Sequence, residues 1–395
     1  MRTPVAGKLR EFFLGNKVKM LKHKNRLKLN FTLPCVIILD FIFSQPVSSQ
    51  EKQSFFSTLY LETTIHEGFL INHHPEMRVL TAGFFPSWEA SLTKQTTGHN
   101  SAVYFRNYPR YGLTYRYNAF GGSPWLGEAH SMMSFINLQI GKTRLVNFDF
   151  RISLGLAYLT NKFDRLENYK NMAIGSNWNA SIAFRVNSRI KISEITDFTV
   201  GISMLHLSNG TIKTPNYGLN IPAVEAGLNF KLNRDEIRYQ IPDSLIFNKG
   251  KKNVRISFGM ATKEILDHWE EDFLVYTGEI AFTGYYNNVN RYIIGFDATY
   301  DQANAIEIAT QGDTTSAWVE ESKFGVIAGH EWVFSRLAMN LSLGFYLYDL
   351  NNSDDPVYNK IGVIYFFSKN LFAGLSLKSH YAKADFLSGN IGLNF

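Results

Sequence analysis

The sequence predicts an all-β fold, an antiparallel transmembrane β-barrel of the outer membrane with about sixteen strands. Three observations support this prediction. From residue 53 onward, apolar and polar residues alternate with a period of two, and aromatic residues make up 15% of the chain. Tight turns alternate with longer polar connections in the second half. The chain ends in an amphipathic segment whose last residue is Phe395.

The predicted strands mix aromatic and β-branched residues with Ser, Thr, Asn and Gly, a composition typical of strands. No helical pattern of useful length interrupts them. They are predicted at Ser57–Thr63, Ala82–Leu92, Tyr111–Phe120, Met132–Ile140, Phe148–Leu159, Asn177–Val186, Phe198–Ser208, Ala223–Leu232, Val254–Met260, Leu274–Tyr285, Tyr292–Tyr300, Phe324–Phe334, Leu337–Tyr348, Val357–Phe367, Leu371–Tyr381 and Phe386–Phe395. A count of about fourteen is the main alternative, because the sequence does not define the ends of the first two strands.

Short and long connections alternate between the predicted strands, so that one end of the barrel has short turns and the other has long loops. Tight turns fall at Asn287–Asn290 and at Ser335–Arg336, whereas Asp301–Ser322 and Asp349–Pro356 are long and polar. Short turns on one side and long loops on the other are typical of outer-membrane barrels. Strands of about ten residues, tilted at about 45°, span a bilayer, and closure leaves no unpaired edge in lipid.

The last predicted strand carries a second indication. Its apolar positions alternate up to Phe395, and a terminal aromatic residue on an amphipathic strand resembles the assembly signal of outer-membrane barrels. The alternative is a β-sandwich or a soluble barrel that happens to end in Phe. No run of 18 apolar residues occurs, so the sequence predicts no helical membrane span.

Residues 1–49 are predicted to be a secretory signal peptide. A basic stretch precedes the apolar segment Phe31–Phe43, and residues suited to a cleavage site follow at Pro46–Ser49. Met20 is an alternative start, which would give a signal of about 30 residues. This order of charged, apolar and small residues predicts export from the cytoplasm.

The charge balance excludes nucleic acid as a partner class. Nine of the 40 Lys and Arg residues, but only two of the 34 Asp and Glu residues, lie in residues 1–49. The remaining 31 basic and 32 acidic residues nearly cancel, so the net charge of +6 belongs to the leader. The single cysteine, Cys35, also lies in the leader; a lipoprotein signal there is the weaker alternative, because Leu33 and Pro34 are not small.

We expect residues 50–395 to form one barrel. Only one terminal aromatic signal exists, and the polar insert at residues 233–253 has no obvious linker composition. Within that barrel, residues 55–232 form the first part and residues 233–395 add further strands. A second unit beside an eight-stranded barrel is the alternative. The sequence leaves the oligomeric state open.

The strongest chemical signal is the run His206–Gly210, at the end of a predicted strand. Residues two apart on a strand share a face, so His206 and Ser208 stand side by side as a base and a hydroxyl nucleophile. Val200 and Ile202 lie on the same face. If the chain enters the barrel from the periplasm, this strand ends at the outer rim, and a lipid ester is the expected substrate.

The run His206–Gly210, followed by Pro215–Gly218, resembles PagL-type lipid A 3-O-deacylases and the acyloxyacyl-hydrolase-like proteins grouped with them. The resemblance covers residues 55–232 and implies an eight-stranded outer-membrane barrel that deacylates lipid A of lipopolysaccharide without a metal or organic cofactor. It implies the roles of the motif residues as follows: His206 as general base, Ser208 as nucleophile, Asn209 as oxyanion donor and the Gly210 backbone N–H as a second donor. The segment Lys378–Phe386 resembles the C-terminal stretch of longer members.

One position departs from the family pattern. The third catalytic member of the family is Glu, and the matching residue here is Asn220. An Asn oxygen can hold the imidazole but supplies no negative charge, so we expect a reduced rate. Glu225, on the following strand, is the other candidate for orienting His206.

Two other functions compete with lipid deacylation. A sixteen-stranded barrel would enclose a water-filled lumen and act as a porin or transporter. A structural or surface-interaction barrel would act through its long loops. His66, His73 and His74 raise the question of a metal site, but they fall in a predicted loop, and no metal is predicted there.

Overall fold

The computed structural model shows a β-structure and describes residues 55–80, 83–98, 100–265, 271–310, 317–351, 355–380 and 383–395. The predicted signal peptide and Cys35 lie outside the described residues. The described residues contain sixteen strands, as the alternation predicted. Thirteen-residue strands such as β7 (Thr196–Ser208) are long enough to cross a bilayer at the tilt of a barrel.

Eight strands form the first half of the described chain. They are β1 (Leu59–Phe69), β2 (Phe84–Gln95), β3 (Arg110–Asn118), β4 (Ala129–Lys142), β5 (Val146–Leu159), β6 (Trp178–Lys191), β7 (Thr196–Ser208) and β8 (Leu219–Lys231). The first strand runs beyond its predicted end at Thr63, because Thr64 and His66 are polar residues that face the barrel interior. Because these interior positions are polar, the apolar alternation did not predict the end of this strand.

Eight more strands form the second half. They are β9 (Lys252–Lys263), β10 (Phe273–Tyr285), β11 (Asn290–Asp301), β12 (Ser322–Phe334), β13 (Leu337–Tyr348), β14 (Val357–Phe366), β15 (Leu371–His380) and β16 (Lys383–Asn394). The helices are short: η1 (Phe55–Thr58), η2 (Pro75–Leu80), α3 (Ser101–Phe105), η3 (Phe120–Gly122), α4 (Asn304–Thr310) and α5 (Ala317–Glu320). Within the described ranges, none of these helices has the length and apolarity needed to cross a membrane.

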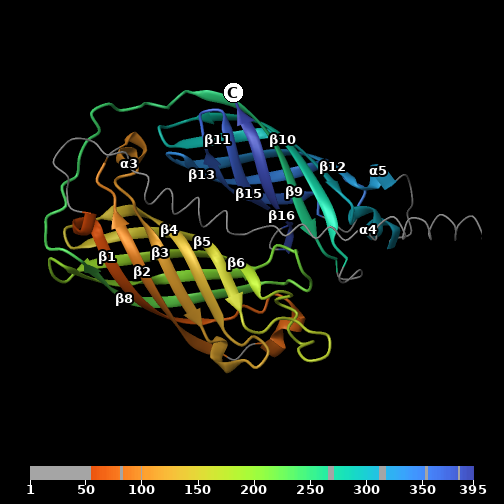
Figure 1. Cartoon of the computed structure of the whole chain (residues 1–395), viewed down its shortest axis with the longest axis horizontal. Helices are drawn as coiled ribbons and strands as arrows, with labels where there is room; N and C mark the ends of the chain where they lie inside the picture. Colours follow the sequence, from red (N-terminus) through yellow and green to blue (C-terminus); the bar gives the residue numbers. More distant parts are fainter. Residues whose placement is uncertain are drawn as a thin grey trace, which may run out of the picture. The chain divides into compact units, whose positions relative to one another are not determined.

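The expectation of a single barrel is wrong. Strand β1 pairs antiparallel with β8, and β9 pairs antiparallel with β16, so the chain closes two separate eight-stranded barrels. In Figure 1 the first barrel runs from orange to green and the second from green-blue to blue. The alternation of residues along each strand is the same in one large barrel and in two small ones, which is why the sequence did not separate them.

Side chains of each strand alternate between the barrel interior and the outer surface. On β7, Val200 and Ile202 are 45% and 61% exposed, whereas Ser203 and Leu205 are buried. The exposed row is apolar, as expected for a surface that faces hydrocarbon. The same row of β7 continues to His206 and Ser208 at the end of the strand.

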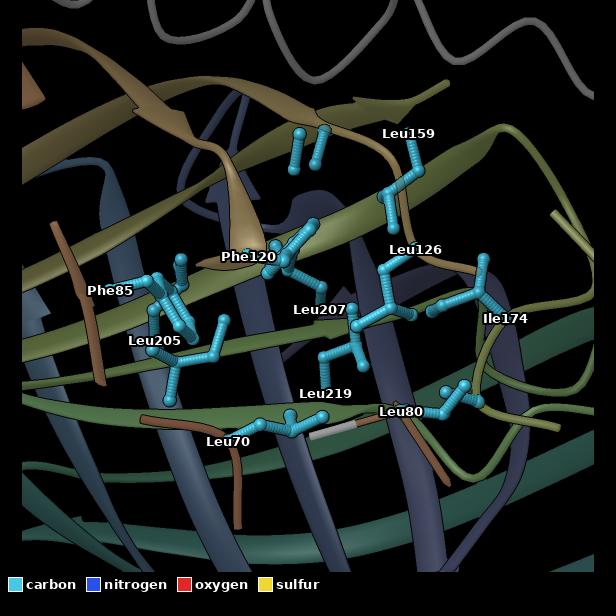
Figure 2. Packing of buried hydrophobic residues seen from close by; sticks show 14 of the residues in the cluster. Leu70, Leu80, Phe85, Phe120, Leu126, Leu159, Ile174, Leu205, Leu207 and Leu219 are labelled. Atoms are coloured by element: carbon cyan, nitrogen blue, oxygen red, sulfur yellow. The ribbon is translucent and has the colours of Figure 1, made fainter. Parts of the chain in front are cut away.

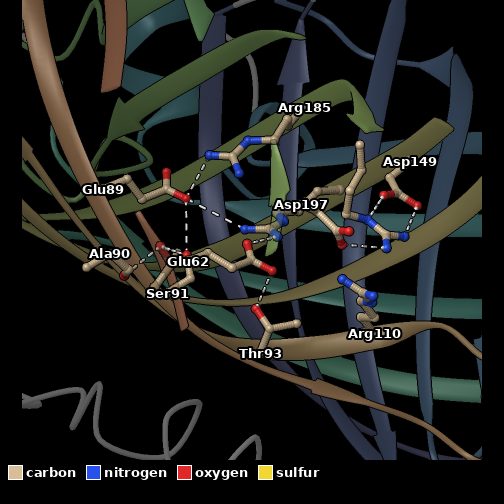
Figure 3. Close-up of polar contacts among 12 residues, drawn as sticks. Glu62, Glu89, Ala90, Ser91, Thr93, Arg110, Asp149, Arg185 and Asp197 are labelled. Atoms are coloured by element: carbon tan, nitrogen blue, oxygen red, sulfur yellow. Dashed lines mark hydrogen bonds and ion pairs between the residues drawn. The ribbon is translucent and has the colours of Figure 1, made fainter. Parts of the chain in front are cut away.

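The interior of the first barrel holds a network of buried charges (Figure 3). Arg185 lies 2.7 Å from Glu89 and 2.8 Å from Glu225, and Arg151 pairs with Glu62. Removing one partner of such a buried pair leaves an uncompensated charge and costs about 3–5 kcal/mol. The network therefore fills the barrel interior, and each buried charge depends on its partner.

An apolar cluster closes the end of the first barrel at which β7 terminates (Figure 2). Leu205 and Leu207 of β7 and Leu219 of β8 are fully buried in it, together with Phe120 and Leu70 from neighbouring connections. Because the odd-numbered residues of β7 are anchored here, the intervening even-numbered residues point to the opposite, outer face.

The second barrel is also filled. Glu331 accepts a hydrogen bond from Arg255 at 2.8 Å and contacts Arg291, all three buried. A cavity of about 40 Å³, bordered by Asp297 and Lys378, has room for a few waters. The interior of an eight-stranded barrel is just wide enough for side chains to fill. In the described part of the chain, neither barrel offers the wide aqueous lumen on which the porin alternative depends.

Candidate functional site

The pairing of β7 with β8 sets the core of the site. His206 is the direct antiparallel partner of Asn220, so their side chains stand on the same face of the sheet. His206 Nδ1 lies 2.7 Å from Asn220 Oδ1. Because a side-chain carbonyl oxygen can only accept, Nδ1 is the donor in this hydrogen bond.

Ser208 lies on the same face as His206, as the sequence spacing predicted. Gly218, in the connection between β7 and β8, covers both residues: a Cβ built on it would lie 3.1 Å from His206 Cε1 and 3.6 Å from Ser208 Cβ. Gly218 also has a φ of +76°, which favours glycine. A side chain at Gly218 would therefore press on the His206 ring, and only the bare backbone fits over the His206 and Ser208 pair.

The Ser208 hydroxyl is held by the loop that follows it. Its Oγ accepts hydrogen bonds from Asn216 Nδ2 at 2.9 Å and from the Gly210 backbone N–H at 3.2 Å. Ser208 is bonded in this way to the loop and not to His206. Two N–H donors thus converge on the oxygen that would attack an ester.

Asn209, the predicted side-chain oxyanion donor, is engaged elsewhere. Its Nδ2 donates to Ser176 Oγ at 3.0 Å and to Lys213 O at 2.9 Å, and the residue is buried. Asn216 donates to Ser208 instead. In the sequence, Asn216 is part of the Pro215–Gly218 motif, but no role could be predicted for it, because its contact with Ser208 depends on how the loop folds back.

Glu225, the alternative orienting residue, lies on the opposite side of the sheet. Its carboxylate faces Arg185 at 2.8 Å and His66 at 3.3 Å inside the first barrel. Glu225 is five residues beyond Asn220 on β8, an odd separation, and residues an odd number apart on a strand face opposite ways. Asn220 is therefore the residue that contacts His206.

The histidines His66, His73 and His74 do not gather at one place. His66 lies inside the first barrel, whereas His73 lies beside Asn220. His66 is fully buried in the interior and contacts Glu89 and Glu225. His73 reaches Asn220 and Tyr217 outside it. Among the described residues, no group of three or more His, Cys, Asp or Glu side chains is arranged to hold a metal ion.

Comparisons with known proteins address the two barrels separately. Residues 82–229 match the family described as lipid A 3-O-deacylase (PagL), and residues 250–395 match the acyloxyacyl hydrolase C-terminal domain. Each match falls on one barrel, and the two together span most of the chain. No curated protein sequence matches the chain.

Three similar solved structures are outer-membrane proteins at low identity. Neisserial surface protein A is 11% identical over 44% of this chain and 96% of that chain, with a TM-score of 0.29. The outer membrane enzyme PagL is 12% identical over 43% of this chain and 98% of its own, with a TM-score of 0.28. A mutant of the Rh. blastica porin is 8% identical over 86% and 99%, with a TM-score of 0.16.

These TM-scores are low, so the assignment rests on the two sequence matches and on the barrels themselves. The two family matches indicate that the protein is located in the outer membrane of a Gram-negative bacterium. By these two matches the chain is similar to PagL-type lipid A 3-O-deacylases over its first barrel and to acyloxyacyl hydrolases over its second, with both parts in one polypeptide.

Proposed function

We propose that this protein is a serine esterase that removes an acyl chain from lipid A or a related lipid of the outer leaflet. The observation that carries the proposal is the pair His206 and Ser208 beneath Gly218, at the end of a strand whose outer row is apolar; Ser208 itself is buried, with 6% of its surface exposed. A lipid ester reaches this outer row without leaving the membrane. The family supports lipid A as the substrate.

The hydrogen bond from His206 to Asn220 determines which nitrogen of the imidazole carries the proton. With the proton on Nδ1, Nε2 carries a lone pair and acts as the general base. The Ser208 hydroxyl turns from Asn216 toward Nε2 when substrate binds, gives up its proton and attacks the ester carbonyl. His206 then protonates the departing alcohol, and water hydrolyses the acyl-enzyme by the same route.

The negative charge of the tetrahedral intermediate needs donors close to Ser208. We assign this role to the Gly210 N–H and to Asn216 Nδ2, because both lie within 3.2 Å of the attacking Oγ and become free to bind the neighbouring carbonyl oxygen once Oγ turns to His206. Asn209 has a different role in this proposal: its amide holds the loop by bonding to Ser176 and to the Lys213 carbonyl. The chemistry requires no metal or organic cofactor.

One observation favours a second candidate, a non-catalytic barrel that binds lipid. Ser208 is bonded to Asn216 and not to His206, and Asn220 supplies no negative charge to an imidazolium. A binding protein would keep the apolar face and the loop without turnover. The lipid composition of the cell separates the two candidates.

The test compares cells that express the wild-type protein, Ser208→Ala or Ser203→Ala. Ser203 is a matched control, because it lies on the same strand but faces the interior. We expect mass spectrometry to detect lipid A with one fewer acyl chain in the wild type and the control, and its absence with Ser208→Ala. Heat-dependent gel mobility checks that each barrel folds. Identical lipids in cells with and without the protein would rule out the esterase.

A further inference from the structure

Asn220 poses a problem that a glutamate would not. A carboxylate offers an oxygen to His206 whichever way it turns, whereas an amide offers an oxygen in one orientation and an NH2 group in the other. Only the first orientation accepts the Nδ1–H of His206 and leaves Nε2 free. A site that uses Asn220 therefore needs a neighbour that holds the amide in place.

The segment Ile71–His74, which follows β1, contacts Asn220 through both main chain and side chain. The Ile71 N–H donates to the Asn220 carbonyl at 2.9 Å. His73 Nδ1 lies 3.5 Å from Asn220 Nδ2, at the long end of hydrogen-bond range, and His73 Nε2 lies 2.9 Å from the Tyr217 carbonyl. Two connections far apart in the sequence are thus joined beside His206.

The partners of His73 determine which of its nitrogens carries the proton. The Tyr217 carbonyl can only accept, so His73 Nε2 is protonated, and in the neutral ring Nδ1 is an acceptor. This nitrogen faces the Asn220 NH2 group, as the orientation required by His206 demands. The Ile71 carbonyl lies 3.2 Å from the same nitrogen, nearer than Asn220 Nδ2, and accepts a hydrogen bond from it only when Nδ1 also carries a proton; in the ring protonated at Nε2 alone, Asn220 is the partner that can donate to Nδ1.

A reversed Asn220 amide would meet mismatched partners at both ends. Its oxygen would face the lone pair of His73 Nδ1, and its NH2 group would face the Nδ1–H of His206. Both hydrogen bonds would be lost unless both rings changed tautomer. The hydrogen bonds from His206 to Asn220 and from Asn220 to His73 can therefore form together in only one orientation of the Asn220 amide.

The neighbouring His74 contributes packing only. Its ring stacks on Tyr217 with centroids 4.1 Å apart and an interplanar angle of 18°. Partial burial lowers the pKa of His74 below its usual range, which favours the neutral ring in the stack. Its ring also packs edge-on against His73, with centroids 5.0 Å apart, so His74→Ala controls for loss of packing around His73 without removing the contact of His73 with Asn220.

We propose that His73 is a positioning residue that fixes the orientation of the Asn220 amide and, through it, the tautomer of His206. This inference rests on the proposed esterase function. It explains how a neutral residue serves where the family has glutamate. No role for His73 followed from the sequence, because His73 and His206 lie 133 positions apart and meet only through loop folding.

The first experiment needs no activity. Protein labelled with ¹⁵N-histidine in detergent micelles reports the tautomer of His206 by NMR, with His206→Ala identifying its signal. We expect the Nδ1–H form in the wild type and in His74→Ala, and a mixture of tautomers in His73→Ala. An unchanged His206 tautomer in a folded His73→Ala protein, or a wild type that lacks the Nδ1–H form, would overturn the proposal.

The second experiment uses Asn220→Glu, which removes the ambiguity of the amide. We expect His73→Ala alone to lower kcat about tenfold with little change in KM, as for the loss of one hydrogen-bonding partner. In the Asn220→Glu background, the same His73→Ala change should have little effect on kcat. Equal losses in both backgrounds would show a purely structural role for His73. A wild type without esterase activity rejects the proposed function, while the NMR result still decides the role of His73.

Discussion

The seventh strand of each barrel ends in a histidine and a serine, yet the two ends differ in register. On β7 the residues are His206 and Ser208, two positions apart, so they share one face of the strand. On β15 they are Ser379 and His380, adjacent in sequence, with a register irregularity before Ser379. Adjacent residues on a regular strand point to opposite faces, so the second barrel does not repeat the arrangement of the first.

The surroundings of the two histidines differ as well. His380 Nε2 lies 3.2 Å from the Tyr346 hydroxyl, and Tyr346 packs on Tyr358 inside the second barrel. Ser379 Oγ accepts from Asn359 Nδ2 at 2.9 Å. In the first barrel the β7–β8 connection supplies Gly218 and Asn216 instead. The comparison teaches that residue types make a candidate site only when strand register and a folded loop place them together.

The sharpest way to break this comparison is to remove each histidine in turn. His206→Ala should lower the rate of lipid deacylation by about 10³–10⁴-fold, the size expected when a general base of a serine hydrolase is lost. His380→Ala should leave the rate within about twofold, since His380 contacts Tyr346 and Tyr358 of the second barrel. Rates are measured on purified protein with mixed lipid and detergent micelles. A large loss with His380→Ala would place chemistry in the second barrel.

The second prediction separates two asparagines of the same loop. Asn216→Ala should lower kcat about 10²-fold, because Asn216 Nδ2 points at the Ser208 oxygen and an oxyanion donor contributes on this scale. Asn209→Ala should act mainly on stability, because its amide bonds to Ser176 and Lys213. Steady-state kinetics and thermal unfolding of both variants check this. A larger loss of kcat in a stable Asn209→Ala protein would reverse the assignment.

The smallest expected loss of activity is for a substitution of Gly218, which lies against His206. Gly218→Ala places a methyl group 3.1 Å from His206 and should lower kcat about tenfold. Gly122→Ala is the matched control: Gly122 has a φ of +75°, nearly that of Gly218, but a Cβ there meets nothing within 4 Å. Both variants carry the same backbone strain of about 1–2 kcal/mol. Equal activity of the two variants would show that the bare backbone over His206 is not needed.

The sequence predicted those features that depend on local pattern. Alternation with period two marked all sixteen strands, and a spacing of two placed His206 and Ser208 on one face. The motif that follows Ser208 indicated the family, which the matches to both barrels bear out. Each of these conclusions needs only the geometry of a single strand or loop, which neighbouring residues determine.

Only the tertiary structure decided which strands close on each other and which side chains meet across connections. The pairing of β1 with β8 produced two barrels where one was expected, because strand alternation carries no information about the partner that closes a sheet. The placement of Glu225 inside the barrel, and the approach of Asn216 and His73 to the site, follow from register and loop folding. These are contacts between segments distant in the chain, and their geometry exists only after the barrel has closed.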